Sequence, residues 1–450
     1  MTPGSLLLTQ IKNMKVMKFG GTSVGSPQRM KNVVELIADG EQNMVVLSAM
    51  SGTTNSLLEI ADYLYKQNQE GANAYITKLE DKYRKHIDEL YSSEEYKQKT
   101  WLQLHAIFDF IRSFTKGDFA AREEKIIVAQ GEILSTNMMT NYLLEQGYDA
   151  VLLPALEFMR TNQDGEPDLK YIQEHASKQL ALYPDKQIYI TQGFICLDAE
   201  GEISNLQRGG SDYTASLLGG ALSASEIQIW TDIDGMHNND PRFVENTTPV
   251  SHLHFDEAAE LAYFGAKILH PTCIQPAKYA NVPVKLLNTM DPTAPGTVIS
   301  NMVEHRKIKA VAAKDNIVAI NITSSRMLLA YGFLRKVFEI FENYKTSIDM
   351  ICTSEVGVSV SIDDKTNLLP ILNELKKLGV VEVDDNMCII CVVGDLDWRN
   401  VGFESVAAEA LKDVPVRMIS YGGSNHNISF LVSAHDKKRA LESLSKYLFG

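Results

Sequence analysis

The chain has 450 residues, of which 45% are hydrophobic and 22% are charged, and its net charge is −14. This composition is ordinary for a globular protein of several domains. The acidic balance argues against a nucleic-acid-binding protein, which needs a basic face. No apolar run approaches the roughly 20 residues of a membrane-spanning helix, and the N-terminal SLLL lacks the basic flank of a signal peptide, so we expect a cytoplasmic location.

Residues 1–13 show no clear period and are expected to form a loose extension. Strand-like and helix-like segments then alternate from Val16 to about residue 305. The expected strands are short and rich in Val and Ile, and several are apolar on both faces, as in a sheet covered by helices on both sides. They are VMKFGG, MVVLSAM, AVLLPA, IYITQGFI, IQIWTDIDG and VPVKLLN. We therefore expect an α/β domain with a largely parallel sheet, in which ligands bind beyond the carboxyl ends of the strands.

Two segments of this first region depart from the alternation. Residues 60–128 are charged and helical in pattern, so we expect a solvated helical insertion that could close a site or form a dimer. Residues 288–300 are dense in Pro, Gly, Thr and Asp and are expected to form turns that close the first domain.

The pattern changes after residue 305. Strand, helix, two strands, helix and strand follow one another up to about residue 385, and a shorter copy of this order occupies residues 386–450. Such an order is typical of a ferredoxin-like unit, here repeated imperfectly. The second copy lacks a last strand of its own, which residues 309–315 could supply. Two small repeats behind an enzyme-like domain suggest a sensor.

The cysteines and histidines predict no metal centre held by side chains. The five cysteines are spread along the chain, as is typical of reduced thiols in a cytosolic protein. Cys388 and Cys391 have CxxC spacing, but the apolar run MCIICVVG around them predicts a buried strand. The HLH sequence at 252–254 lacks further clustered ligands.

A glycine-rich stretch, VMKFGGTSVGSP at 16–27, follows the first strand and precedes a helix. Its lysine, Lys18, lies before the glycines, so the stretch is neither a Walker A loop nor a dinucleotide fingerprint. Glycines and a helix N-terminus favour a bound anion, although glycine pairs at strand ends are often only turns. A lysine inside an apolar strand is costly unless it meets an anion or a carboxylate.

Two later clusters repeat this chemistry. LQRGGSDYTASLLGG at 206–220 places Arg208 beside a glycine pair, which suits a carboxylate or a phosphate; a capped helix is the alternative. IWTDIDGMHNNDPR at 229–242 places Thr231 and Asp232 at a strand end, where a nucleotide or magnesium could bind, and offers Arg242 to a phosphate. Taken alone, these residues also fit simple turns.

Taken together and in order, these motifs resemble aspartate kinase. The matching segments are KFGGTSVG, SAMSGTTN, QGEILST, RTN, TQGFI, RGGSDYTA, WTDIDG, DPR and FGAKILHP. The segments GFLRKVFEIF, DMICTSEVGVS and RMISYGGSNHNISFLV resemble the tandem ACT domains of the monofunctional, lysine-sensitive branch, and we expect no fused homoserine dehydrogenase domain. The resemblance implies a carbamate-kinase-like three-layer sandwich at 14–305, followed by ACT domains at 306–385 and 386–450, with the strand near 309–315 possibly shared.

The resemblance also implies the activity and the site. The family uses MgATP to phosphorylate the side-chain carboxylate of L-aspartate, the first step of lysine, threonine and methionine biosynthesis. Matching the family's motifs gives Lys18 and Asp212 as catalytic residues and Thr54, Glu132, Arg208 and Ser211 as substrate contacts. The nucleotide contacts are Lys18, Gly20, Gly21, Ser23, Thr231, Asp232, His237, Arg242 and Lys267, although Tyr is common in the place of His237.

The resemblance further implies feedback by an amino acid, with lysine the expected effector because the retained carboxylates suit a cation. The matching effector residues are Met327, Gly332, Phe333, Leu334, Asp349, Ser354 and Glu355, whereas Leu329 and Ala330 replace residues that are often polar. We expect a homodimer or higher oligomer through the ACT units. A glutamate or acetylglutamate kinase and a non-catalytic amino-acid sensor remain as alternatives.

Overall fold

The computed structural model describes residues 14–206, 209–265, 269–325, 327 and 331–450. The loose extension expected at 1–13 lies outside these residues. The chain divides into two compact units, which are described separately below. The first unit is Met1–Gly235 with Leu269–Asn301, and the second is Met236–Ile268 with Met302–Gly450.

The first unit is an α/β fold, as expected, on a sheet with the strand order β3-β4-β2-β1-β7-β9-β10. The pairs from β3 to β9 are parallel and β10 is antiparallel to β9. The strands are β1 (Lys15–Phe19), β2 (Asn43–Leu47), β3 (Ala150–Leu152), β4 (Ile188–Gln192), β7 (Glu226–Thr231), β9 (Val284–Asn288) and β10 (Thr297–Ser300), with a separate hairpin of β5 (Ile195–Leu197) and β6 (Ile203–Asn205). The helices are α2 (Pro27–Ile37), α3 (Thr53–Tyr65), α4 (Gln69–Leu90), α5 (Glu94–Ser113), α6 (Ala121–Glu145), α7 (Leu169–Ala181), α8 (Gly210–Ala221) and α10 (Gln275–Ala280).

Helices cover the central strands, and side chains alternate between the two faces of the sheet. Met17 and Phe19 of β1 enter a core that also contains Leu134 and Met138 of α6. Lys18, between them, points to the opposite face. The helix α8 contacts β1, β2 and β7, so the lysine of the glycine-rich stretch is directed toward α8.

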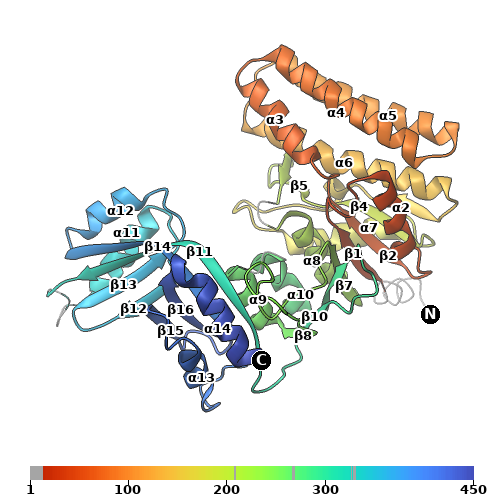
Figure 1. The fold of residues 1–450 in the computed structure, drawn as a ribbon. Helices are drawn as coiled ribbons and strands as arrows, with labels where there is room; N and C mark the ends of the chain where they lie inside the picture. Colours follow the sequence, from red (N-terminus) through yellow and green to blue (C-terminus); the bar gives the residue numbers. More distant parts are fainter. Residues whose placement is uncertain (1–13, 207–208, 266–268, 326, 328–330) are drawn as a thin grey trace. The chain divides into compact units, whose positions relative to one another are not determined.

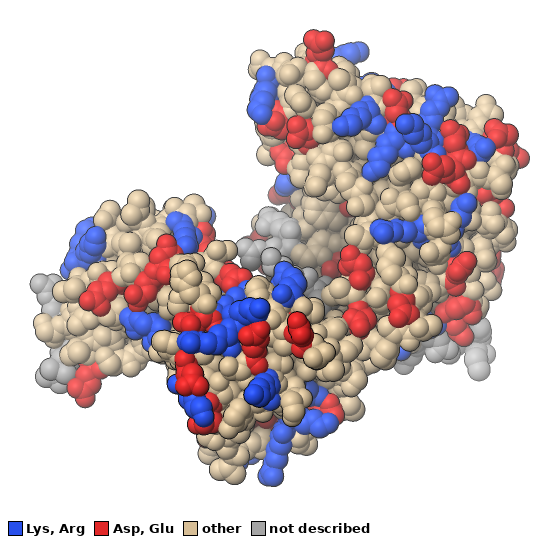
Figure 2. Space-filling model, viewed as in Figure 1, with Lys and Arg blue, Asp and Glu red and all other residues tan. Residues whose placement is uncertain are grey.

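The insertion expected at 60–128 is helical, as predicted. Helices α3, α4 and α5 project from the sheet in Figure 1 and are called the helical arm below. Charged side chains of both signs are interspersed over the arm in Figure 2. Its inner face is not solvated, however, because Ile76, Tyr83 and Phe108 are fully buried and join the core of α2 and α6.

The segment expected to form turns at 288–300 contains a strand. Its last four residues are β10, which pairs with β9 through Val298 and Ile299. Ile299 is fully buried. In the structure Thr297 and Ile299 are buried and Val298 and Ser300 are half-buried. The turn-forming residues before this short strand hid it in the sequence.

The second unit contains an antiparallel sheet with the order β12-β13-β11-β14-β16-β15. Its strands are β11 (Ile308–Thr323), β12 (Met350–Thr353), β13 (Gly357–Ile362), β14 (Val380–Gly394), β15 (Val416–Tyr421) and β16 (Asn427–Ser433), and the short strand β8 (His252–His254) precedes α9. Its helices are α9 (Phe255–Tyr263), α11 (Phe333–Asn343), α12 (Leu368–Leu375), α13 (Phe403–Ala410) and α14 (Lys437–Phe449).

Two long strands, β11 and β14, are neighbours at the centre of this sheet and pair along most of their length. The first part of β11, from Ile308 to Lys314, pairs with residues 389–394 of β14, and its last part pairs with both β13 and residues 380–383 of β14. One core forms around α11 and α12 and another around α13 and α14. The CIIC sequence lies within β14, where Cys388 and Cys391 are fully buried, as predicted.

None of the described helices combines the length and apolar character needed to cross a lipid bilayer.

Candidate active site

The glycine-rich stretch forms a tight loop between β1 and α2. The amide of Ser23 donates to the carbonyl oxygen of Gly20 at 2.9 Å. A Cβ atom on Gly21 would lie 2.9 Å from the carbonyl oxygen of Ala49, so glycine lets this loop pack directly against the loop that follows β2. The hydroxyl of Ser23, expected at the phosphates, is buried and hydrogen-bonded to Oγ1 of Thr289 at 2.8 Å.

Lys18 and Asp212 form an ion pair beside this loop. The distance from Lys18 Nζ to Asp212 Oδ1 is 2.6 Å, and the two side chains are 12% and 18% exposed. A Cβ atom on Gly20 would lie 3.3 Å from the same ammonium. This ion pair explains why an otherwise apolar strand tolerates a lysine, because the charge of Lys18 is balanced by the carboxylate of Asp212 from α8.

The first turn of helix α8 carries two of the predicted site residues. Gly209, its N-cap, has φ +76°, a left-handed conformation that favours glycine. Ser211 and Asp212 lie in the first turn, where the helix dipole favours an anion. The amide of Asp212 itself donates to the carbonyl oxygen of Gly209 at 2.9 Å. The hydroxyl of Ser48, after β2, donates to Oγ of Ser211 at 2.9 Å.

A cavity of about 340 Å³ opens at this edge of the sheet. Residues 48–55, which follow β2 and run into the first turn of α3, form much of its wall; this segment is called the substrate loop below. The lining residues are Gly21, Ser48, Ala49, Met50, Ser51, Gly52, Thr54, Asn55, Glu132, Phe194, Gly210 and Ser211. The predicted substrate contacts Thr54, Glu132 and Ser211 are therefore brought together at one cavity.

Glu132 of α6 is the ionisable group most changed by this environment. Its side chain is 4% exposed, and burial raises its pKa to about 7 against the opposing effect of a backbone hydrogen bond. Oε1 accepts the amide of Ala49 at 3.1 Å. Oε2 is buried and has no hydrogen-bond partner among the described residues. A buried acceptor of this kind calls for a donor, and an ammonium group in the cavity would supply one.

Thr231 and Asp232 follow the carboxyl end of β7, next to β1 in the sheet. The hydroxyl of Thr231 donates to Oδ1 of Asp232 at 3.2 Å, and the carbonyl oxygen of Thr231 accepts the amide of Thr289. The first unit therefore presents a threonine and a carboxylate at the edge where the sequence predicted them.

His237 and Arg242 belong to the second unit. Nδ1 of His237 is hydrogen-bonded to Oγ1 of Thr247 at 2.8 Å. Arg242 forks onto the carboxylate of Asp240, with an Nη2–Oδ2 distance of 2.6 Å, and its side chain is 69% exposed. The predicted phosphate ligand is thus paired within its own turn. Arg208 and Lys267 lie outside the described residues.

Comparison with known proteins matches the fold and the motifs. Residues 13–288 match the model of the amino acid kinase family, and residues 390–448 match an ACT domain model. The chain is 33% identical over 450 residues to lysine-sensitive aspartokinase 3 of Escherichia coli, covering 96% of this chain and 99% of that protein. It is 35% identical to the chloroplastic aspartokinase 1 of Arabidopsis thaliana, covering 96% of this chain and 80% of that protein.

Solved structures of aspartokinases have a similar fold. The structure of E. coli aspartokinase III in complex with aspartate and ADP, in its R-state, superposes with a TM-score of 0.81 at 31% identity, covering 97% of this chain and 100% of that one. The T-state complex of the same enzyme with lysine and aspartate gives a TM-score of 0.80 at 33% identity, covering 97% and 100% of the two chains.

The chain belongs to the aspartokinase family. It is an aspartate kinase, a phosphotransferase whose acceptor is a carboxylate group, and its C-terminal region contains an ACT domain.

In this aspartokinase the predicted effector residues lie at separate places on the second unit. Gly332, with φ +80°, caps α11, whose first residue, Phe333, is buried in the core beside Met327. Asp349 precedes β12, whereas Ser354 and Glu355 follow it. An extended strand advances about 3.3 Å per residue, so Asp349 and Ser354 lie about 16 Å apart along the chain.

Asp349 is the most enclosed of the predicted effector residues, with a fully shielded side chain. Oδ1 accepts hydrogen bonds from Nζ of Lys314 at 2.6 Å and from the hydroxyl of Tyr263 at 2.7 Å. Burial raises the pKa of Asp349 against these two donors. Oδ2 is buried without a hydrogen-bond partner among the described residues.

The prediction that the HLH sequence lacks clustered ligands was wrong. One ligand atom from each of His254, Asp256 and His426 lies within 4.8 Å of the others. The imidazoles of His254 and His426 stack with centroids 5.5 Å apart. Sequence inspection missed the cluster because His426 comes from the turn between β15 and β16, far along the chain.

Two residues that contact the substrate loop were also missed by the sequence. Lys82 and Tyr83, both on α4, reach Ser51 and Thr53 of that loop. They lie in a helical pattern rich in charge, and the helical period alone does not say which loop a side chain meets.

Proposed function

We propose that this aspartokinase transfers the γ-phosphoryl group of ATP to the side-chain carboxylate of L-aspartate. A carboxylate is already a nucleophile, so the protein has to hold the two substrates in line and neutralise the charge that develops between them. Lys18 is proposed to meet that charge, and Asp212 to hold its ammonium in place. The glycine loop and the N-terminus of α8 are proposed to receive phosphate and carboxylate oxygens.

The unpartnered carboxylate oxygen of Glu132 supports this assignment most directly. It lies at the cavity, it is buried, and it suits the α-ammonium group of an amino acid. Thr54 and Ser211 line the same cavity, and Arg208 is the proposed partner of the α-carboxylate. An acetylated amino acid would bring no ammonium group to Glu132, which disfavours acetylglutamate as the substrate.

The proposed nucleotide contacts are those of the sequence prediction: Gly20, Gly21, Ser23, Thr231, Asp232, His237, Arg242 and Lys267. Magnesium is proposed to accompany the nucleotide. Asp232 offers carboxylate oxygens of the kind that Mg²⁺ prefers, and Mg²⁺ on a nucleotide is held largely by phosphates and waters. The ion would neutralise charge on the phosphates.

Lysine is the proposed effector. Lysine appears together with aspartate in the T-state complex of the E. coli enzyme, and Asp349 has a buried oxygen that suits an ammonium group. Because Asp349 and Ser354 lie at opposite ends of β12, we propose that Ser354 and Glu355 contact a different part of the effector or a second chain. The ACT boundaries at 306–385 and 386–450 remain a proposal.

A homodimer or higher oligomer through the ACT units is proposed on the apolar side chains that α11 presents to solvent. Leu334 and Phe338 are 38% and 42% exposed.

The proposed location is the cytoplasm, which suits the free thiols of Cys196, Cys273, Cys352, Cys388 and Cys391.

Release of ADP with aspartate, glutamate or acetylglutamate as the acceptor tests the substrate, and titration of lysine, threonine and methionine tests the effector. We expect turnover with aspartate and inhibition by lysine. Turnover with glutamate but not aspartate would overturn the first proposal, and inhibition by threonine alone would overturn the second.

A further inference from the structure

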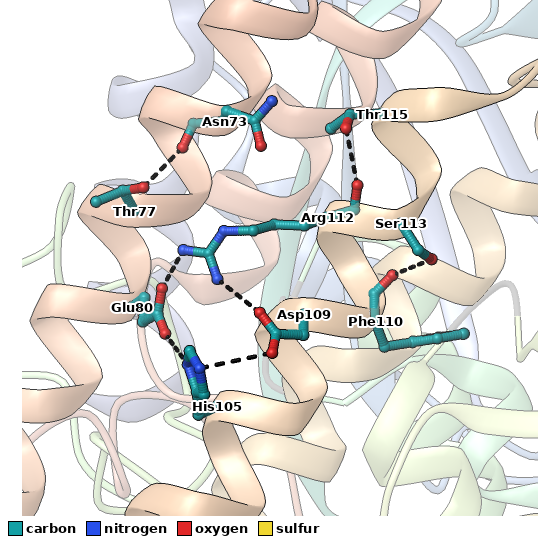
Figure 3. Close-up of polar contacts among 9 residues, drawn as sticks. All are labelled: Asn73, Thr77, Glu80, His105, Asp109, Phe110, Arg112, Ser113 and Thr115. Atoms are coloured by element: carbon teal, nitrogen blue, oxygen red, sulfur yellow. Dashed lines mark hydrogen bonds and ion pairs between the residues drawn. The ribbon is translucent and has the colours of Figure 1, made fainter.

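The helical arm is fixed by a buried polar cluster between α4 and α5. Glu80 of α4 is 7% exposed; it accepts hydrogen bonds from Arg112 and, at 2.6 Å, is bonded to Nδ1 of His105, both on α5 (Figure 3). Asp109 lies between Arg112 and His105 on the same helix. A buried carboxylate held by two partners is costly to disturb, so α4 is a firm support.

Two neighbouring residues of α4, Lys82 and Tyr83, form hydrogen bonds to the substrate loop. Nζ of Lys82 donates to the carbonyl oxygen of Ser51 at 2.9 Å. The hydroxyl of Tyr83 is hydrogen-bonded to Oγ1 of Thr53 at 2.9 Å, and both side chains are fully buried. The contacts fall on either side of Gly52, which has φ +81°.

Ser51 is consequently held from two directions. Its amide donates to the carbonyl oxygen of Gly21, in the glycine loop, at 3.2 Å, and its carbonyl oxygen accepts the ammonium of Lys82. The backbone of Ser51 therefore joins the glycine-rich loop to α4 through its amide on one side and its carbonyl group on the other. A small displacement of this backbone would change the cavity wall formed by Ser51, Gly52 and Thr54.

We propose that Lys82 is a positioning residue for the amino-acid substrate. Its ammonium fixes the Ser51 peptide, and through it the wall of the aspartate cavity, without touching the reacting atoms. The inference rests on the proposed function, because it takes aspartate to occupy that cavity.

The surroundings of Lys82 favour this role over a general contribution to stability. Burial lowers the pKa of Lys82, so the ammonium is held at some electrostatic cost. It also borders an open groove of about 680 Å³ along α4, shared with Lys78, Lys85 and His86. A lysine needed only for solubility would extend into that groove, whereas Lys82 turns back to a backbone carbonyl of the substrate loop.

The test is steady-state kinetics of the full chain carrying Lys82→Met. Loss of the bond to Ser51 frees the cavity wall, and we expect the KM for aspartate to rise about tenfold. We expect kcat and the KM for ATP to stay within about twofold of wild type. Lys82→Arg retains a donor and should recover much of the loss. Lys85→Met, which removes an exposed lysine from the same groove, is the matched control and should behave as wild type.

Tyr83→Phe keeps the buried ring and removes only the contact with Thr53, so it should raise the KM for aspartate in the same direction. Direct binding of aspartate, measured by calorimetry, checks any variant whose turnover is too low. An unchanged KM for Lys82→Met, or equal rises for aspartate and ATP with a lower Tm, would overturn the inference. Failure of the wild-type chain to release ADP with aspartate would overturn the proposed function instead.

Discussion

The hydroxyl of Tyr263 donates a hydrogen bond of 2.7 Å to Oδ1 of Asp349, a carboxylate whose side chain is fully shielded from solvent. Tyr263 is the last residue of α9, and Asp349 precedes β12. The ammonium of Lys314 lies 4.3 Å from the centre of the Tyr263 ring and bonds to the same carboxylate oxygen. The proposed effector carboxylate is thus bonded to the helix that leads into the FGAKILHP segment.

This contact predicts a change in feedback rather than in catalysis. Tyr263→Phe removes one donor from Asp349, and a hydrogen bond to a charged group is worth about 1.5–3 kcal/mol. We expect the lysine concentration for half-inhibition to rise roughly tenfold or more, with kcat in the absence of lysine within about twofold. Tyr279→Phe, at a side chain that is 82% exposed, is the control. An inhibition curve identical to wild type would contradict the link.

Lys18→Met should greatly reduce the rate of phosphoryl transfer. Removing one preorganised charge partner from a developing anion typically lowers kcat by about 10²–10³-fold, and it also leaves Asp212 without its ion pair. ADP release measures the loss. Lys15→Met removes a lysine from the same strand that pairs with Asp39 at the surface and should keep near-normal activity. Turnover of Lys18→Met within tenfold of wild type would remove Lys18 from the catalytic role.

Glu132 should make aspartate binding depend on pH. Burial raises the pKa of its carboxyl group to about 7 from 4.5, so the free enzyme loses the anionic form as the pH falls through 7. We expect the KM for aspartate to increase below pH 7 and the KM for ATP to change little. The measurement is KM for both substrates between pH 5.5 and 8.5. A KM for aspartate that stays flat over this range would argue against Glu132 as the ammonium partner.

The raised pKa of Glu132 also makes the stability of the protein depend on pH, in the opposite direction to aspartate binding. A carboxyl whose pKa is higher in the folded than in the unfolded state favours folding when protonated, so stability falls as the pH rises from 4.5 through 7. The full shift corresponds to a free energy on the order of 3 kcal/mol. Glu132→Gln should therefore raise the Tm at pH 8 relative to wild type, raise it less at pH 5, and greatly weaken aspartate binding. Thermal unfolding at the two pH values distinguishes this pattern from a general loss of packing.

Substitution of Gly219 by alanine should destabilise the protein. In an ordinary exposed helix, Gly→Ala is stabilising by up to about 1 kcal/mol, but a Cβ atom on Gly219 would lie 2.3 Å from Cγ1 of Ile227. Overpacking of this kind costs about 1–3 kcal/mol. Gly117→Ala, at a position with open space around it, is the comparison. If denaturant unfolding gave Gly219→Ala the same stability as wild type, the packing of α8 on β7 would be looser than the structure indicates.

The sequence predicted those features that depend on local pattern. The parallel sheet, the helix after the glycine loop and the buried CIIC strand all follow from short apolar runs and their punctuation. The resemblance to aspartate kinase indicated which acid would order Lys18, and the structure brings Asp212 to it.

Features that depend on the meeting of distant segments could not be predicted. The contact of Lys82 with Ser51 joins a charged helix to a segment 31 positions earlier. The sequence of neither segment indicates that the two meet. His426 reaches His254 in the same way. The strand β10 was obscured because Pro295 and Gly296 immediately precede it, and turn-forming residues give a stronger local signal than a four-residue alternation.

The continuity of β11 and β14 limits how the regulatory region can be rearranged. Since each strand contributes to both cores of the second unit, a cut between residues 385 and 386 would sever a paired strand rather than a linker. Neither half could be exchanged with a homologue alone without losing part of its own sheet. Feedback sensitivity in this chain is therefore a property that can be transplanted, or inherited by recombination, only as one block.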